Sequence, residues 1–134
     1  MTNVNPPPSI LVLEDNLALS RLYAKVLNQA GCHVYLAQSV KDARALLLSD
    51  EKFDIFLCDL QIGQELSLDL LRESKALPHQ TQLQTIVVTG SGRFQLFAEE
   101  LSSVYFLEKP VDINMLHAMI TRVLATPKLQ TLKI

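Results

Sequence analysis

The sequence has no surplus of basic residues and no long apolar run. Twelve Lys and Arg stand against 14 Asp and Glu, which gives a formal net charge of −2. Direct nucleic-acid binding is disfavoured, because affinity for the phosphate backbone depends on excess positive charge. No apolar stretch approaches the roughly 20 residues that span a bilayer, and the N-terminus has no signal-peptide core. We therefore expect a cytoplasmic protein without membrane contact.

Glycine and cysteine are also scarce. The four glycines form neither GxxxxGK[ST] nor GxGxxG, which excludes the usual glycine-rich phosphate loops. The two cysteines, Cys32 and Cys58, are isolated in the sequence, and we interpret them as buried thiols rather than a disulfide or a metal pair. The three histidines lie in unrelated segments without ligand spacing, so we assign them no chemistry.

What is present predicts one globular domain. The 134 residues, 49% apolar and 19% charged, are enough for a sizeable core with an ordinary surface. There is no internal repeat. Residues 1–8, with three consecutive prolines, predict a disordered or extended lead-in. Residues 9–126 then form the folded domain, and residues 127–134 form a tail or the start of a linker.

Strand and helix patterns alternate along this domain. Apolar segments predict strands at 10–13, 33–37, 53–58, 85–89 and 104–108. Capping residues and helical periodicity predict helices at 16–30, 39–48, 67–75, 94–101 and 112–125, with a loop at 78–84. Strands that are apolar throughout are typical of a parallel sheet covered on both faces. The predicted fold is α/β, a doubly wound five-stranded parallel sheet flanked by five helices.

Polar residues stand at the carboxyl ends of four of these strands: Glu14, Asp15, Asp59, Thr89 and Lys109. Ligands bind at this edge of an open parallel sheet. Carboxylates bind Mg²⁺ or another divalent cation, and one of them can attack phosphorus. A hydroxyl and an ammonium group can hold phosphate oxygens. Each residue alone is more often a turn, cap or surface position, but their joint occurrence favours a metal and phosphoryl site.

These motifs resemble the receiver domain of two-component response regulators. LVLEDN, CDLQI, VVTG and FLEKP are similar to the family's acidic-pair, phosphoacceptor, switch-hydroxyl and lysine-proline motifs, and the resemblance covers residues 10–124. The intervals of 44 residues from Asp15 to Asp59 and 30 from Asp59 to Thr89 are family-like. The interval of 20 from Thr89 to Lys109 is slightly short. The resemblance implies a flavodoxin-like, receiver-type fold.

The resemblance implies a role for each residue of the phosphoryl site. Asp59 would be the phosphoacceptor, and Lys109 would balance the charge of the phosphate. Glu14, Asp15, Asp59 and the backbone carbonyl of Gln61 would hold the metal ion. The Gln61 side chain would project near the site, where it could orient or exclude the hydrolytic water.

The resemblance also implies a switch. Thr89 would be the switch hydroxyl, and Pro110 would occupy the family's cis-type peptide position. Phe106 falls at the position of the switch aromatic, and a one-residue slip would assign that role to Tyr105. Both aromatics also suit an ordinary core position in a strand.

The segment after Asp59 departs from the pattern of the family. Gly63 stands where proline is common, and no second glycine occurs near Ser67. The departure concerns the conformation of this loop and the lifetime of a phosphoryl group, and it leaves the nucleophile in place.

Two functions stay open at this point. In the first, a sensor histidine kinase or phosphotransfer protein phosphorylates Asp59 in a Mg²⁺-dependent reaction, and the domain signals to an output domain, a downstream protein or a second copy of itself. It would catalyse only its own phosphoryl transfer and autodephosphorylation, and would not otherwise be an enzyme. In the second, the chain is a pseudo-receiver that binds or dimerises without phosphate. A phosphatase of the haloacid dehalogenase type is rejected, because it needs an acid at position 61.

Overall fold

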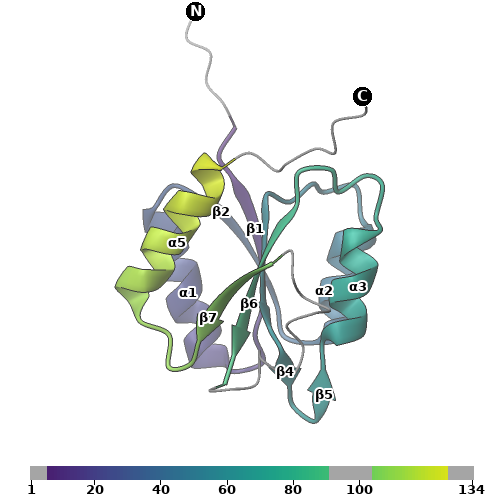
Figure 1. Cartoon of the computed structure of the whole chain (residues 1–134), viewed down its shortest axis with the longest axis horizontal. Coiled ribbons are helices and arrows are strands. Elements are labelled where there is room, and N and C mark those ends of the chain that lie inside the picture. Colours follow the sequence, from purple (N-terminus) through teal and green to yellow (C-terminus); the bar gives the residue numbers. More distant parts are fainter. Residues whose placement is uncertain (1–5, 91–103, 127–134) are drawn as a thin grey trace, which may run out of the picture.

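A central parallel sheet with helices on both faces forms the molecule (Figure 1). The structure, a computed structural model, describes residues 6–90 and 104–126. The strand order β2-β1-β3-β6-β7 is that of a doubly wound sheet. Its strands are β1 Ser9–Leu13, β2 His33–Ala37, β3 Ile55–Asp59, β6 Gln84–Thr89 and β7 Tyr105–Glu108. All five predicted strands are present, with bounds shifted by at most two residues.

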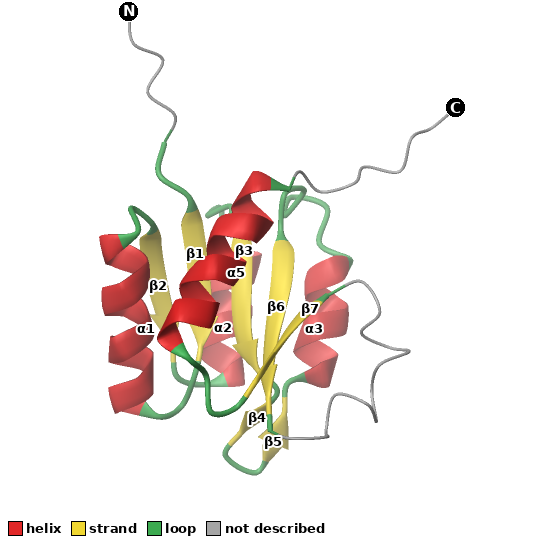
Figure 2. Ribbon diagram, turned by 60° about the vertical axis from the view of Figure 1, so that its left-hand side comes forward, coloured by secondary structure: helices red, strands yellow, loops and turns green. Residues whose placement is uncertain are grey.

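Helices cover the sheet in two pairs. The described helices are α1 Leu17–Gln29, α2 Val40–Leu48, α3 Leu68–Lys75 and α5 Ile113–Ala125. Figures 1 and 2 show α1 and α5 on one face and α2 and α3 on the other. The helix predicted near 94–101 lies outside the described residues. The predicted fold class is confirmed, and none of the described helices is long and apolar enough to cross a membrane.

Capping residues set the helix ends that the sequence predicted. The Asn16 side chain accepts a hydrogen bond from the Leu19 amide at 3.0 Å, and Ser39 Oγ accepts one from the Asp42 amide at 3.0 Å. Gly31, with φ of +87°, follows the end of α1 in a left-handed conformation that favours glycine.

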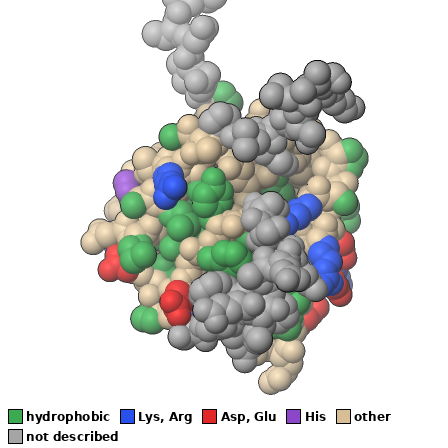
Figure 3. Space-filling view, in the orientation of Figure 1, with side chains coloured by type: hydrophobic (Ala, Val, Ile, Leu, Met, Phe, Trp, Pro, Cys, Tyr) green, Lys and Arg blue, Asp and Glu red, His purple; other side chains and the backbone are tan. Residues whose placement is uncertain are grey.

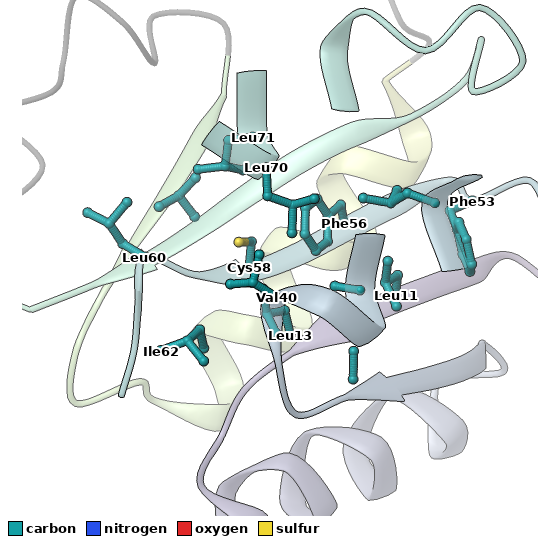
Figure 4. Close-up of a cluster of buried hydrophobic side chains, with 14 of the residues drawn as sticks. Leu11, Leu13, Val40, Phe53, Phe56, Cys58, Leu60, Ile62, Leu70 and Leu71 are labelled. Atoms are coloured by element: carbon teal, nitrogen blue, oxygen red, sulfur yellow. The ribbon is translucent and has the colours of Figure 1, made fainter. Parts of the chain in front are cut away.

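Apolar side chains fill the space on both faces of the sheet. One cluster, on the side of α2 and α3, includes Leu13, Phe56 and Leu70, all at most 1% exposed (Figure 4). The other lies on the side of α1 and α5 and includes Val12 and Leu57. Successive strand residues point to opposite faces, so burial on both sides explains why the strands are apolar throughout.

A short hairpin after β3 was not predicted. β4 Gln61–Ile62 and β5 Glu65–Leu66 pair antiparallel and form a separate two-stranded sheet. Gly63, in the turn, has φ of +59°, which only glycine adopts without strain. Two-residue strands are too short to show a period of two, so no pattern in the sequence marks them.

Candidate functional site

Three carboxylates meet at the carboxyl edge of the sheet, as predicted. Glu14 and Asp15 follow β1, and Asp59 ends the neighbouring strand β3. One carboxylate oxygen from each lies within 4.8 Å of the other two. Glu14 and Asp59 are 2% and 4% exposed, whereas Asp15 is exposed to solvent. The site is therefore a buried acidic pair with a third acid at its mouth.

Lys109 supplies the positive charge of the site. Its Nζ lies 2.5 Å from Asp59 Oδ2 and 3.8 Å from Glu14 Oε1. Its backbone amide donates to the Thr89 carbonyl at 2.8 Å, which extends the β6–β7 pairing to the site. Burial alone would lower the pKa of Lys109, but the hydrogen bond and charges of Asp59 and Glu14 outweigh it and raise the pKa above its ordinary value. Lys109 is therefore held as a cation.

Glu14 is the most perturbed acid of the site. Burial, followed by the hydrogen bond and charge of Asp59, raises the pKa of Glu14 to about 8, although Lys109 opposes the shift. Its Oε2 atom is buried and makes no hydrogen bond within the described residues. A buried carboxylate oxygen without a partner is costly. The described residues therefore leave this oxygen of Glu14 without a partner.

The unpredicted hairpin donates two backbone amides to the acids. The Gln61 amide lies 3.0 Å from Asp59 Oδ1, and the Gly63 amide lies 2.9 Å from Asp15 Oδ2. The Gln61 side chain donates to the Gly63 carbonyl at 3.3 Å, within the hairpin. The departure at Gly63 has a consequence, because a proline there would have no amide to donate to Asp15.

Thr89 ends β6 beside Asp59 and is 1% exposed. Its hydroxyl donates to the Gly90 carbonyl at 3.3 Å, a long hydrogen bond. Tyr105 and Phe106, both half-buried in β7, pack against opposite core clusters, Tyr105 on the α1 and α5 side and Phe106 on the α2 and α3 side. The peptide bond before Pro110 is cis.

The acids of the site fit a divalent cation. Mg²⁺ prefers oxygen ligands and is commonly held by one or two carboxylates, with water completing its shell. Three carboxylates are close enough to share one ion, and Oε2 of Glu14, which has no hydrogen-bond partner among the described residues, is available as a metal ligand. A cation would also relieve the repulsion among the acids.

Curated relatives show similarity over most of the chain. The transcriptional regulatory protein CpxR of Klebsiella pneumoniae is 30% identical over 115 residues, which are 86% of this chain and 48% of that protein. The response regulator protein PilR of Pseudomonas aeruginosa is 29% identical over 85% of this chain and 25% of its own length. The chain thus spans about half the length of the first and a quarter of the second.

Solved structures show the same fold. A response regulator receiver protein from Pseudomonas putida is 28% identical, with a TM-score of 0.76 and coverage of 89% of this chain and 99% of that one. A CheY-like receiver domain protein from Methanospirillum hungatei JF-1 has a TM-score of 0.78 at 23% identity, covering 89% and 94%. At that identity, the second likeness supports the fold alone.

The family follows from a match to its sequence profile. The profile of the response regulator receiver domain covers residues 10–121, which include every strand end described above. The chain therefore belongs to the response regulator receiver domain family, the receiver domains of two-component response regulators.

Proposed function

We propose that this chain is a phosphoacceptor module in which Asp59 receives a phosphoryl group from a sensor histidine kinase or phosphotransfer protein in the cytoplasm. One observation carries the proposal. The Asp59 carboxylate is 4% exposed and lies between the Lys109 ammonium group and two further acids at the carboxyl edge of the sheet. A nucleophile, a counter-charge and metal ligands thus stand together, as phosphoryl transfer to a carboxylate requires.

Each residue of the site has a separate task. Asp59 attacks phosphorus through an oxygen and forms an acyl phosphate, while the donor's leaving group takes the bonding electron pair. Glu14, Asp15, Asp59 and the backbone carbonyl of Gln61 would hold Mg²⁺, which would neutralise charge on the transferred group. Lys109 releases its ion pair with Asp59 and binds a phosphate oxygen instead, because the carboxyl group of an acyl phosphate no longer carries a negative charge.

Thr89 and one aromatic residue of β7 would report the phosphorylated state. The 3.3 Å hydrogen bond from Thr89 to the Gly90 carbonyl is weak enough to be exchanged for one to a phosphate oxygen. Movement of Thr89 would then change the packing of Phe106, or of Tyr105, in the neighbouring strand. We expect the altered surface to include α5 and β7, over which apolar side chains gather (Figure 3). Met115 on α5 is 61% exposed.

The receiver would act through an attached output domain, a downstream protein or a second copy of the chain. This part of the proposal is supported by the share of the curated relatives that the chain spans, about half of CpxR and a quarter of PilR. The chain would not be an enzyme beyond its own phosphorylation and autodephosphorylation.

The test is incubation with a small phosphodonor, such as acetyl phosphate, and Mg²⁺, followed by mass analysis. Wild type should gain one phosphoryl group, and Asp59→Asn, which removes the nucleophile with little change in shape, should gain none. Omission of Mg²⁺ should prevent the gain in wild type. No gain in either protein would favour the alternative, a pseudo-receiver that binds or dimerises without phosphate.

Gln61 is proposed to act on the hydrolytic water. Gln61 is an exposed residue of β4, the short strand that follows Asp59, and its side-chain amide lies within the hairpin next to the site. The phosphate half-lives of wild type and Gln61→Ala should therefore differ when the donor is removed. Equal half-lives would contradict this role and leave the phosphoacceptor role of Asp59 untouched.

A further inference from the structure

Ser67 precedes α3 and is fully buried, with 0% of its surface exposed. A serine at this position normally caps its own helix through its hydroxyl. The Ser67 hydroxyl makes no such bond. It lies 2.7 Å from the carbonyl oxygen of Asp59 and 3.1 Å from that of Leu60. The Ser67 side chain thus binds the backbone at the end of β3, which carries Asp59, rather than the first turn of α3.

A neighbouring thiol contacts both the Ser67 hydroxyl and the Asp59 carbonyl. Cys58 Sγ lies 3.2 Å from Ser67 Oγ. Either atom can be the donor in this contact, and the Cys58 thiol also donates to the Asp59 carbonyl at 3.5 Å. The Ser67 hydroxyl is shared between the Asp59 and Leu60 carbonyls, of which the Asp59 carbonyl is nearer. Cys58, Ser67 and the backbone of Asp59 thus form one buried group of hydrogen-bonded atoms.

Backbone hydrogen bonds hold the same segment, the residues next to Asp59. The Ser67 amide donates to the Leu60 carbonyl at 2.8 Å, and the Leu60 amide donates to the Val88 carbonyl at 2.9 Å. The peptide planes on either side of Leu60 therefore have fixed orientations. Those planes set where the Asp59 carboxylate lies relative to Lys109 and to the Gln61 amide, which binds its other oxygen.

We propose that Ser67 is a positioning residue for phosphoryl transfer, whose hydroxyl orients the Asp59 carboxylate by holding the Asp59 and Leu60 carbonyls. The proposal rests on the proposed function of Asp59. Ser67 does not touch the reacting atoms and takes no part in proton transfer. Its effect is on the geometry of attack, to which phosphoryl transfer is sensitive, because in-line displacement needs an aligned nucleophile.

A purely structural hydroxyl on the same helix provides the matched control. Ser74 is 2% exposed, and its hydroxyl donates to the Leu71 carbonyl at 2.8 Å, within α3. Ser67→Ala and Ser74→Ala each remove one buried hydroxyl and its hydrogen bonding to backbone carbonyls, those of Asp59 and Leu60 for Ser67 and that of Leu71 for Ser74. We therefore expect both variants to lower the thermal midpoint by comparable amounts.

The experiment measures the rate constant for phosphorylation by acetyl phosphate at saturating Mg²⁺, together with the donor concentration that gives half the maximal rate. Ser67→Ala should lower the maximal rate constant roughly three- to tenfold, the kinetic equivalent of one hydrogen bond. The half-saturating concentration should not change, because Ser67 does not contact the donor. Ser74→Ala should phosphorylate at the wild-type rate, and Ser67→Thr, which keeps the hydroxyl, should recover more of the rate than Ser67→Gly.

The outcomes separate this proposal from the proposed function. A wild-type rate in Ser67→Ala, or an equal loss in Ser74→Ala, would overturn the positioning role while Asp59 remains the acceptor. If Ser67→Thr does not fold, the comparison of Ser67→Ala with Ser74→Ala still decides. If wild type itself takes up no phosphoryl group, the proposed function fails, and the role of Ser67 fails with it.

Discussion

Two buried polar side chains at opposite edges of the sheet, Gln80 and Glu14, are each 2% exposed, yet they differ in their hydrogen bonding. Gln80 lies in the loop before β6, at the amino edge. Its Oε1 accepts a hydrogen bond from the Phe53 amide, and its Nε2 donates to the carbonyls of Leu47 and Glu51 at 3.1 and 2.7 Å. Every polar atom of this side chain has a protein partner.

Glu14, at the carboxyl edge, is left incomplete. One of its oxygens faces Lys109 at 3.8 Å, and the other makes no hydrogen bond within the described residues. Two more carboxylates lie close by. Equally buried polar side chains therefore have opposite effects on stability. The glutamine joins its own loop to the segment 47–53 and adds stability, whereas the acid carries an electrostatic cost that a cation can relieve.

Gln80→Ala is the largest expected loss of stability. It removes three hydrogen bonds and leaves the Phe53 amide buried without a partner, so the free energy of unfolding should fall by about 3 kcal/mol. Gln82→Ala, in the same loop but exposed, is the control and should change little. Denaturant unfolding measures both. Equal effects of the two substitutions would contradict the stabilising role of the Gln80 hydrogen bonds.

The pH dependence of stability in Glu14→Gln tests the electrostatic cost of the buried Glu14 carboxylate. The pKa of Glu14 is about 8 in the folded chain and ordinarily 4.5. The folded protein therefore binds a proton that the unfolded chain has released, and the free energy of unfolding should fall as pH rises from about 4.5 towards 8. Without metal, we expect a fall on the order of 2 kcal/mol in wild type and a flatter profile in Glu14→Gln.

The controls for this profile are a metal chelator and Glu65→Gln. Glu65 is an exposed acid of the nearby hairpin, so its substitution should leave the wild-type profile unchanged. Added Mg²⁺ should restore the stability of wild type at pH 8 and stabilise Glu14→Gln less. An identical pH profile in wild type and Glu14→Gln would show that Glu14 is not the acid of the site whose pKa is raised.

Gln84→Ala should have a smaller effect at the amino edge. The Gln84 side chain donates to the carbonyls of Val123 and Thr126 at 3.1 and 2.9 Å, at the carboxyl end of α5. Val123 is buried, but Thr126 is exposed, so water can replace the lost donor at one of the two carbonyls. We expect a loss of about 1 kcal/mol by denaturant unfolding. A loss as large as that of Gln80→Ala would mean that burial is not what separates the two glutamines.

Tyr23→Phe is the smallest expected change and has the opposite sign. The Tyr23 hydroxyl is buried in α1 and makes no hydrogen bond within the described residues. Burial, and then the charges of Glu14 and Asp59, raise its pKa, so it remains neutral. Loss of an unsatisfied hydroxyl should leave stability unchanged or raise it by up to about 1 kcal/mol. A clear loss of stability in Tyr23→Phe would show that this hydroxyl has a hydrogen-bond partner.

Much of the candidate site could be predicted because its residues are marked by local sequence. Each strand is a continuous apolar run, and the polar residue that ends it stands out at once, as at Asp59 and Lys109. The rule that parallel strands present their carboxyl ends at one edge then brings these residues together. The 4.8 Å grouping of the acids agrees with that expectation.

Other parts could not be predicted, because their partners are distant in sequence. The segment containing Gln80 is polar and was interpreted as a loop, but its buried side chain binds the backbone of residues 47–53, about 30 positions earlier in the sequence. Ser67 looked like an ordinary start of a helix, and its hydroxyl binds residues seven and eight positions earlier. The hairpin at 61–66 is too short for a periodic pattern.

The sequence by itself determined the fold class, the order of strands and helices along the chain, and the identity of the polar residues at the carboxyl edge of the sheet. Apolar periodicity and caps are local properties, and a sheet with helices on both faces follows from them. Only the tertiary structure decided which buried polar atoms are satisfied. It fully pairs Gln80, leaves Glu14 open to a cation and turns Ser67 towards Asp59, because hydrogen bonds between distant segments depend on packing rather than on local pattern.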